Sequence, residues 1–453
     1  MATNDVEAKV RRPSTTAKPI VCITADCHIG TFLMDWSDYL EPRFREEYQR
    51  GRDFLMSFAK PGETPDLSKL FETVMPGVDR FNPIAEILRP DVVKRQHEER
   101  KAFLMKHFGD PGDLALLSTG GEGNPDRQLK ELEADGTVGG ICLPQTGPFT
   151  FGKLTPELAK ANAEAVNRWS CDFVAQHPDR HAGVITVSLE AGVDVAVQQI
   201  REGHSKGLRG GVVLDNNPEL KGLPLYNARF WEPIWAVCAE LGVVVILHAG
   251  AGHPVPEAGG EILWSIDTRW FTERPLRYLI VGGVFERHPN LKVIFIETNA
   301  AWAVEELAML DAVCGGDWRK FDMQHRRFIH FHGTHDIREE DRVVASLKRA
   351  KTALKKLPSE YFASNVWLSI TANVDDWAAR ETLGTHKLLW GSDYPHNEST
   401  WPNSMHEVNK TIRMLDVPDS DVRRLMGGNA AELWGFDLQK LEPVANRVGP
   451  VFN

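Results

Sequence analysis

Short apolar runs alternate with amphipathic helical segments along the middle of the sequence, and this alternation limits the possible folds more than any other feature. One helical segment begins at Thr155, a residue type that caps helices, with Pro156 at its first position. A strand that alternates with a helix at this spacing predicts parallel βαβ units, and near-continuous apolar strands suit burial on both faces. The four predicted strands of this part are residues 138–145, 181–189, 208–216 and 242–248.

Further apolar runs bring the number of predicted strands to eight; they are residues 20–29, 291–298, 366–371 and 387–392. Eight parallel strands are typical of a (β/α)8 barrel of the TIM type. An open, doubly wound sheet produces the same alternation, but no strand here is followed by a GxGxxG or GxxxxGK[ST] phosphate loop. The glycine-rich segment 250–260 lacks that spacing and is predicted to be a mobile active-site loop. We therefore expect the barrel.

The length of 453 residues is explained by insertions into one domain, residues 19–440, because TIM barrels of ~250 residues can exceed ~400 when loops are extended. A long insertion follows the first strand at 30–137, and a second precedes the seventh strand at 312–360. We expect the first to form part of a substrate wall, with structural packing or a subunit contact as the alternative, and the second to form a lid or a subunit contact. Residues 1–18 are predicted to be a mobile N-terminal tail, and 441–453 a C-terminal tail.

Composition is that of an ordinary globular protein, with 42% hydrophobic and 25% charged residues. The net charge of -11 argues against binding to nucleic acid. The expected partner is a small-molecule substrate. The six cysteines form no CxxC motif and are expected to be reduced. Neither a signal-peptide core nor a membrane span of ~18 apolar residues is recognisable. We expect a cytoplasmic protein without membrane contact; whether it forms a homo-oligomer stays open.

Polar residues that bind metals stand where several predicted strands end. Asp26 and His28 close the first apolar run and, at a spacing of two, point to one side of a strand. His248 ends the run of residues 242–248, and Asp393 follows the run of residues 387–392. Because the carboxyl ends of parallel strands meet at one face of a barrel, these side chains are expected to converge.

Four motifs carry a resemblance to a known family: Asp-x-His at 26–28, LHAG at 247–250, GGVFERHPNLKVIFIET at 282–298 and LLWGSDYPHNESTWP at 388–402. Together they resemble the amidohydrolase-related family (amidohydrolase 2 type) of the metal-dependent hydrolase superfamily, in particular its aminocarboxymuconate-semialdehyde decarboxylase branch. The resemblance runs from about residue 20 to about residue 437. It implies a (β/α)8 barrel with a divalent metal at its C-terminal mouth.

Glu297 departs from the pattern of the decarboxylase branch, whose members carry a catalytic histidine at the matching strand end. A glutamate beside a metal can act as a ligand, as a general base or as an acceptor for a substrate donor; it can also only orient His248. With Asp26 and Asp393 it brings three negative charges, which makes two metal ions as reasonable as one. The set of oxygen and nitrogen ligands suits Zn, Mn or Fe.

The sequence thus favours a metal-dependent hydrolase that cleaves an amide, ester or thioester of a small molecule. Asp26, His28, His248 and Asp393 are the expected ligands, Glu297 a further candidate ligand, and Asp393 and Glu297 the expected catalytic residues. Nonoxidative decarboxylation of an aromatic or unsaturated acid is the first alternative, and it ranks second because an anionic Glu297 repels a carboxylate. A non-catalytic metal-binding barrel is the last alternative.

Four histidine or tryptophan residues complete the predicted site. His253, His396 and Trp401 lie in the loops after the strands that carry ligands and are predicted to contact substrate. His332 belongs to the histidine-rich stretch HRRFIHFHGTH, in the second insertion, and is predicted as a supplementary ligand. A structural role in the insertion is the simpler alternative for that stretch.

Overall fold

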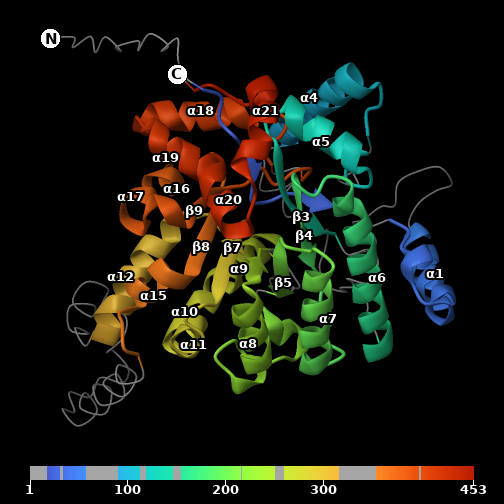
Figure 1. The fold of residues 1–453 in the computed structure, drawn as a ribbon, viewed down its shortest axis with the longest axis vertical. Coiled ribbons are helices and arrows are strands. Elements are labelled where there is room, and N and C mark those ends of the chain that lie inside the picture. The colour runs from blue at the N-terminus through green and yellow to red at the C-terminus, as the bar shows by residue number, and fades with distance from the viewer. Residues whose placement is uncertain are drawn as a thin grey trace.

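The structure is a computed structural model, and nine parallel β-segments form its centre (Figure 1). It describes residues 18–30, 34–57, 90–112, 119–145, 155–215, 217–249, 260–315, 354–396 and 399–452. The strands follow the order β1-β3-β4-β5-β6-β7-β8-β9, and β2 also pairs with β3. Their bounds are β1 Ile23–Thr24, β2 His28–Ile29, β3 Gly139–Pro144, β4 His181–Ile185, β5 Gly211–Asp215, β6 Val244–His248, β7 Lys292–Ile296, β8 Val366–Ile370 and β9 Leu388–Trp390.

Hydrogen bonds between the first and last strands bring the sheet round into a barrel. The Ala25 N–H donates to the Trp390 carbonyl at 2.9 Å, and the His28 N–H donates to the Tyr394 carbonyl at 2.7 Å. Since β1 and β2 together fill one strand position, the sheet has the eight positions of a (β/α)8 barrel. The predicted fold class is confirmed, and the open doubly wound sheet is wrong because such a sheet would leave these two edges apart.

Helices surround the barrel, and most follow a strand as the alternation predicts (Figure 1). The predicted cap at Thr155 is confirmed: its hydroxyl accepts from the Leu158 N–H at 3.3 Å. The helices are α1 Pro42–Met56, α4 Pro90–Phe108, α5 Pro125–Ala134, α6 Pro156–Ala175, α7 Val193–Ser205, α8 Glu232–Leu241, α9 Gly260–Glu273, α10 Pro275–Val281, α11 Val284–Arg287, α12 Ala301–Gly315, α15 Pro358–Asn365, α16 Val374–Ala378, α17 Arg380–Leu383, α18 Ser404–Leu415, α19 Asp419–Arg423, α20 Asn429–Trp434 and α21 Leu438–Val448.

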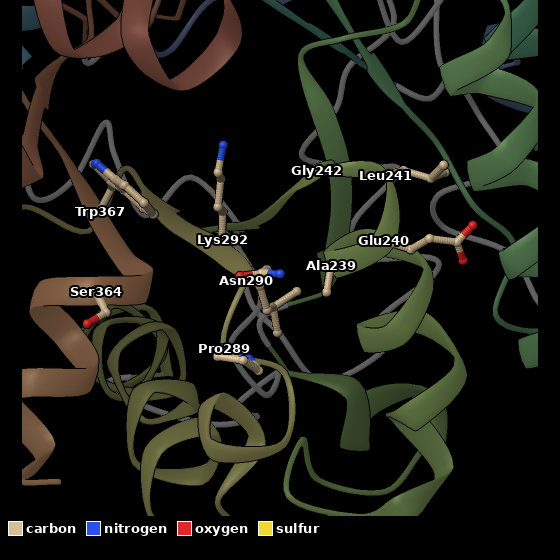
Figure 2. Close-up of a pocket in the computed structure, with 10 residues that line it drawn as sticks. Ala239, Glu240, Leu241, Gly242, Pro289, Asn290, Lys292, Ser364 and Trp367 are labelled. Carbon is tan, nitrogen blue, oxygen red and sulfur yellow. The ribbon is translucent and has the colours of Figure 1, made fainter.

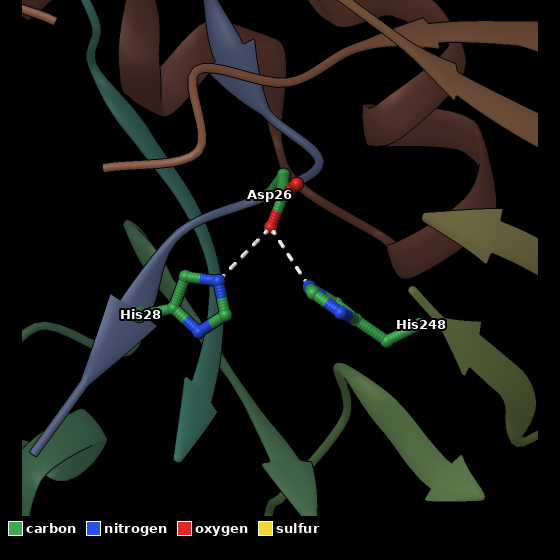
Figure 3. A group of neighbouring side chains, drawn as sticks. All are labelled: Asp26, His28 and His248. Carbon is green, nitrogen blue, oxygen red and sulfur yellow. Dashed lines mark ion pairs between the residues drawn. The ribbon is translucent and has the colours of Figure 1, made fainter. Parts of the chain in front are cut away.

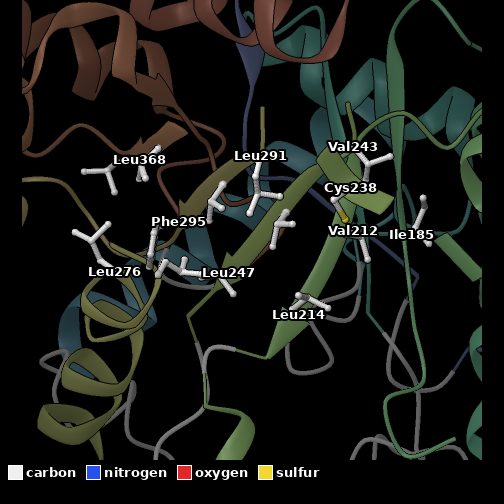
Figure 4. Close-up of a cluster of buried hydrophobic side chains, with 14 of the residues drawn as sticks. Ile185, Val212, Leu214, Cys238, Val243, Leu247, Leu276, Leu291, Phe295 and Leu368 are labelled. Atoms are coloured by element: carbon white, nitrogen blue, oxygen red, sulfur yellow. The ribbon is translucent and has the colours of Figure 1, made fainter. Parts of the chain in front are cut away.

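Alternation along each strand divides the apolar core into two layers. Ile246 packs inside the barrel with residues of other strands, such as Ile294. Its neighbour Leu247 faces outward and belongs to the cluster between the sheet and the helices (Figure 4), which also contains Leu276 of α10. Because successive side chains alternate, His248 points to the same side as Ile246, into the mouth of the barrel.

The predicted insertions and tails are described only in part. The first insertion contains α1, α4 and α5, while most of 312–360 and residues 1–17 lie outside the described residues. Residues 441–448 belong to α21 instead of a tail, with Leu441 and Ala445 buried. Among the described residues, no helix is both long and apolar enough to cross a membrane.

Candidate metal centre

The strand ends bring four predicted ligands together at the C-terminal mouth of the barrel. Asp26 Oδ1 lies 3.5 Å from His28 Nε2 and 3.6 Å from His248 Nε2 (Figure 3). His28 Nε2 lies 3.3 Å from Asp393 Oδ1. The first three residues form a group whose ligand atoms lie within 4.8 Å of one another, and His28, Asp393 and His396 form a second such group.

These ligand atoms are buried and have no hydrogen-bond partner. Asp26 Oδ1, His28 Nε2, His248 Nε2 and Asp393 Oδ1 all fall into this class, although buried polar atoms in proteins are normally satisfied. Imidazole nitrogens and carboxylate oxygens are ligands of Zn, Mn and Fe. The residues therefore fit a divalent metal, which would satisfy these atoms together.

A hydrogen bond determines which ring nitrogen of His248 is available to a metal. The His248 Nδ1–H donates to the Ala249 carbonyl at 2.8 Å, which assigns the proton to Nδ1 and leaves Nε2 as the ligand atom. Without a metal, burial opposes the charged imidazole, but Glu297 and Asp26 raise the pKa of His248 to about 10. A proton therefore competes with the metal at this residue.

The two carboxylates remain ionised despite their burial. Burial raises the pKa of each, and the Asp393 charge also raises that of Asp26, yet the nearby His248 and His28 imidazoles bring the pKa of Asp26 below its ordinary value. At Asp393 desolvation is likewise overcome, by the charge of His396 and by the nearby His28 imidazole, so its pKa is also lowered. Both side chains are thus anionic at neutral pH.

Backbone geometry explains the Gly-Ser-Asp sequence at the end of β9. A Cβ on Gly391 would lie 2.7 Å from Asp26 Cβ, so only glycine allows the two segments to approach this closely. The Ser392 N–H donates to Thr24 Oγ1 at 2.9 Å, and that hydroxyl donates to the Asp26 carbonyl at 2.7 Å. Asp393 has φ 55°, a left-handed conformation that is rare for residues other than glycine and is typical of functional sites.

Glu297 and His396 line the same centre. Glu297 follows β7 with φ 62°, and its Oε2 lies 3.5 Å from His248 Nδ1. His396 Nδ1 lies 3.0 Å from Asp393 Oδ1 and 4.0 Å from Glu297 Oε1. The His396 ring also stacks on His28, with centroids 4.0 Å apart. The structure thus brings His396, predicted as a substrate contact, into the ligand cluster itself.

Gln145 is a site residue that the sequence reasoning missed. It follows β3, is 7% exposed, and its side-chain amide contacts His396 Nε2. A lone glutamine carries no metal or acid–base signal. The available signal was its position directly after an apolar strand, at the face of the barrel where the ligands lie.

The other predicted substrate contacts are less close to the centre or not described. Trp401 is 1% exposed; its ring packs edge-on against Tyr394, and its Nε1–H donates to the Glu131 carbonyl at 3.2 Å. These contacts indicate a structural role for Trp401, which packs against the loop that carries Asp393. His253 and His332 lie outside the described residues.

A cavity of about 550 Å³ lies away from this centre (Figure 2). Its lining includes Gly242, Lys292 and Trp367, which stand at the beginnings of β6, β7 and β8. It therefore opens at the opposite end of the barrel. Since ligand atoms converge at the C-terminal mouth, the chemistry is assigned there.

The sequence and the fold were compared with known proteins. The family model described as "Amidohydrolase" matches residues 144–436. A curated protein from Dictyostelium discoideum, 2-amino-3-carboxymuconate-6-semialdehyde decarboxylase, is 24% identical over 328 residues, which cover 70% of this chain and 78% of that protein.

Two solved structures support the fold. An amidohydrolase from Mycobacterium avium subsp. paratuberculosis K-10 aligns with a TM-score of 0.52 at 22% identity, covering 70% of this chain and 75% of that one. The apo form of IDCase from Metarhizium anisopliae aligns with a TM-score of 0.51 at 18% identity, covering 70% and 79%. The family model spans well over half of the sequence and includes His248 and Asp393. This chain is therefore a member of the amidohydrolase family and an enzyme of that superfamily.

Proposed function

We propose that this enzyme removes a carboxyl group, without oxidation, from a small aromatic or unsaturated carboxylic acid, and that it uses a divalent metal. The observation that carries the metal is the convergence, at the barrel mouth, of four buried side-chain atoms that make no hydrogen bond. The decarboxylase similar to this chain supports the reaction class. We therefore rank decarboxylation first and hydrolysis second. The sequence alone favours the opposite order.

Asp26, His28, His248 and Asp393 would hold the metal, which supplies positive charge that binds and polarises an oxygen of the substrate. The residues of the chain perform the remaining tasks. Because Asp26 and Asp393 are buried and anionic, they would neutralise that charge. Asp26 Oδ1 also lies between the imidazoles of His28 and His248, 3.5 Å and 3.6 Å from their Nε2 atoms.

His396 is the best-placed group to protonate the carbon that loses the carboxyl group. Its Nδ1 faces the Asp393 carboxylate at 3.0 Å, which stabilises the imidazolium, and Gln145 contacts Nε2. The ring is fixed on its other side by the stack on His28. The imidazolium can therefore give its proton to the carbanionic carbon as carbon dioxide leaves.

Hydrolysis is the second candidate, because Glu297 adds a third carboxylate within 4.0 Å of the histidines. Such a group suits a general base that takes a proton from water. It suits a decarboxylase less well, since an anionic carboxylate repels the anionic substrate unless it holds a proton or binds a substrate hydroxyl or amine.

Products distinguish the two reactions. Protein reconstituted with Zn, Mn or Fe is incubated with aromatic and unsaturated acids, and separately with amides, esters, thioesters and lactones. In heavy water, decarboxylation releases carbon dioxide and leaves deuterium on carbon; in water enriched in heavy oxygen, hydrolysis places the label in a carboxylate.

Asp393→Asn should abolish turnover, while the exposed Asp194→Asn on α7 serves as the matched control. Label in the carboxylate of an ester or amide product, with no carbon dioxide from any acid, would reject decarboxylation.

A further inference from the structure

Three of the four proposed ligands lie where the barrel closes. Asp26 and His28 belong to the first strand position, and Asp393 follows the last strand. The two segments are joined by single hydrogen bonds, such as Asp393 N–H to the Asp26 carbonyl at 2.9 Å and His28 N–H to the Tyr394 carbonyl at 2.7 Å. We call the junction of these two segments the seam. The spacing of the three ligands therefore depends on how rigidly the two segments of the seam are fixed to each other.

Helix α5 of the first insertion covers the seam with one face. Gln128 and Glu131 are three residues apart, so they share that face, and both are fully buried. The Gln128 side-chain amide donates to the His28 carbonyl at 3.1 Å and lies 3.5 Å from Cys27 Sγ. Gln128, at one end of this face, thus binds the segment that carries His28.

Glu131, at the other end of this face, binds the loop after β9. The Glu131 carboxylate accepts from the Tyr394 hydroxyl, and the Glu131 carbonyl accepts from the Trp401 indole at 3.2 Å. A Cβ on Gly121 would lie 2.5 Å from the Tyr394 hydroxyl and 2.9 Å from Gln128 Cα. Gly121 can therefore lie between Tyr394 and α5 only because it carries no side chain.

We propose that Gln128 and Glu131 are positioning residues, which set the geometry of the metal centre by clamping its two ligand-bearing segments to one rigid helix. This inference rests on the proposed metal centre. It gives part of the insertion after the first strand a function that differs from the substrate wall expected from the sequence. Loss of partners that orient metal ligands typically weakens metal binding by about 10- to 100-fold.

The test uses the full chain and cobalt(II), whose visible spectrum reports the arrangement of its ligands. Gln128→Met removes the amide that holds His28 and keeps the length of the side chain. Tyr394→Phe removes only the hydroxyl, which contacts both Glu131 and Thr119. Lys130→Met places the same new residue on the exposed face of α5 and is the matched control.

We expect Gln128→Met and Tyr394→Phe each to raise the cobalt dissociation constant about tenfold and to change the spectrum, with Lys130→Met like wild type. The unfolding midpoints of the metal-free proteins should fall too little to account for this. Equal affinities and spectra in all four proteins would overturn the positioning role and leave the proposed function intact. A loss of affinity that only follows a loss of metal-free stability would also overturn it. Wild-type protein that neither binds cobalt nor releases carbon dioxide would reject the proposed function itself.

Discussion

Asp135 is expected to make the enzyme less stable as the pH rises from about 4 to about 7. The residue follows α5, is 5% exposed, and its Oδ1 accepts from the Ser404 N–H at 2.9 Å. Its Oδ2 has no hydrogen-bond partner. Burial raises the pKa of Asp135 from 3.8 to about 7, although the hydrogen bonds from Ser404 and the charge of Arg100 act in the opposite direction.

The size of the effect follows from linkage. Between pH 4 and pH 7 the folded protein keeps the Asp135 proton while the unfolded chain releases it, so the free energy of unfolding falls as the pH rises. A difference of about three pKa units at ~1.4 kcal/mol each gives an upper limit of ~4 kcal/mol. Asp135→Asn keeps an acceptor for Ser404 but cannot ionise. The variant should therefore match wild type near pH 4 and exceed it by up to that amount at pH 8.

Urea unfolding of the metal-free proteins at several pH values measures this difference directly. Chelator in all samples excludes the titration of the metal centre, and the exposed Asp194→Asn controls for the loss of one charge. A difference between Asp135→Asn and wild type that stays constant from pH 4 to pH 8 would refute the argument, because it would show that Asp135 has the same pKa in both states.

Three further predictions concern the metal centre. Because His248 must lose its proton to bind, cobalt affinity should rise by about tenfold per pH unit between pH 6 and pH 9, and calorimetry in two buffers should detect the released proton. Glu297→Gln should tighten binding of benzoate to the metal-loaded protein by removing a like charge; a weaker complex would show that Glu297 itself holds the acid. Gly391→Ala should cost about 1–3 kcal/mol of stability and weaken cobalt binding, because its Cβ would meet Asp26 at 2.7 Å; unchanged unfolding in urea would contradict this.

The barrel and its ligands could be predicted because their signals are local. Each strand is a short apolar run, and parallel strands in a barrel must end at one face, so His248 and Asp393 converge from separate motifs. Gln145 and the clamp by α5 could not be predicted in this way. Gln128 contacts the His28 carbonyl across 100 residues of sequence, and nothing near either residue indicates that contact.

The charges at the mouth explain why His396 matters for the choice between the two reactions. In the proposed centre a divalent metal would balance Asp26 and Asp393, which would leave the charge of Glu297 uncompensated when a carboxylate substrate arrives. A charged His396, 3.0 Å from Asp393 and 4.0 Å from Glu297, restores the balance and carries the proton that decarboxylation requires. Hydrolysis needs no such compensation, since its neutral substrate adds no charge. His396→Gln keeps a hydrogen-bonding side chain but removes both the charge and the proton. It should therefore abolish carbon dioxide release and weaken benzoate binding, whereas ester hydrolysis that relies on Glu297 would continue.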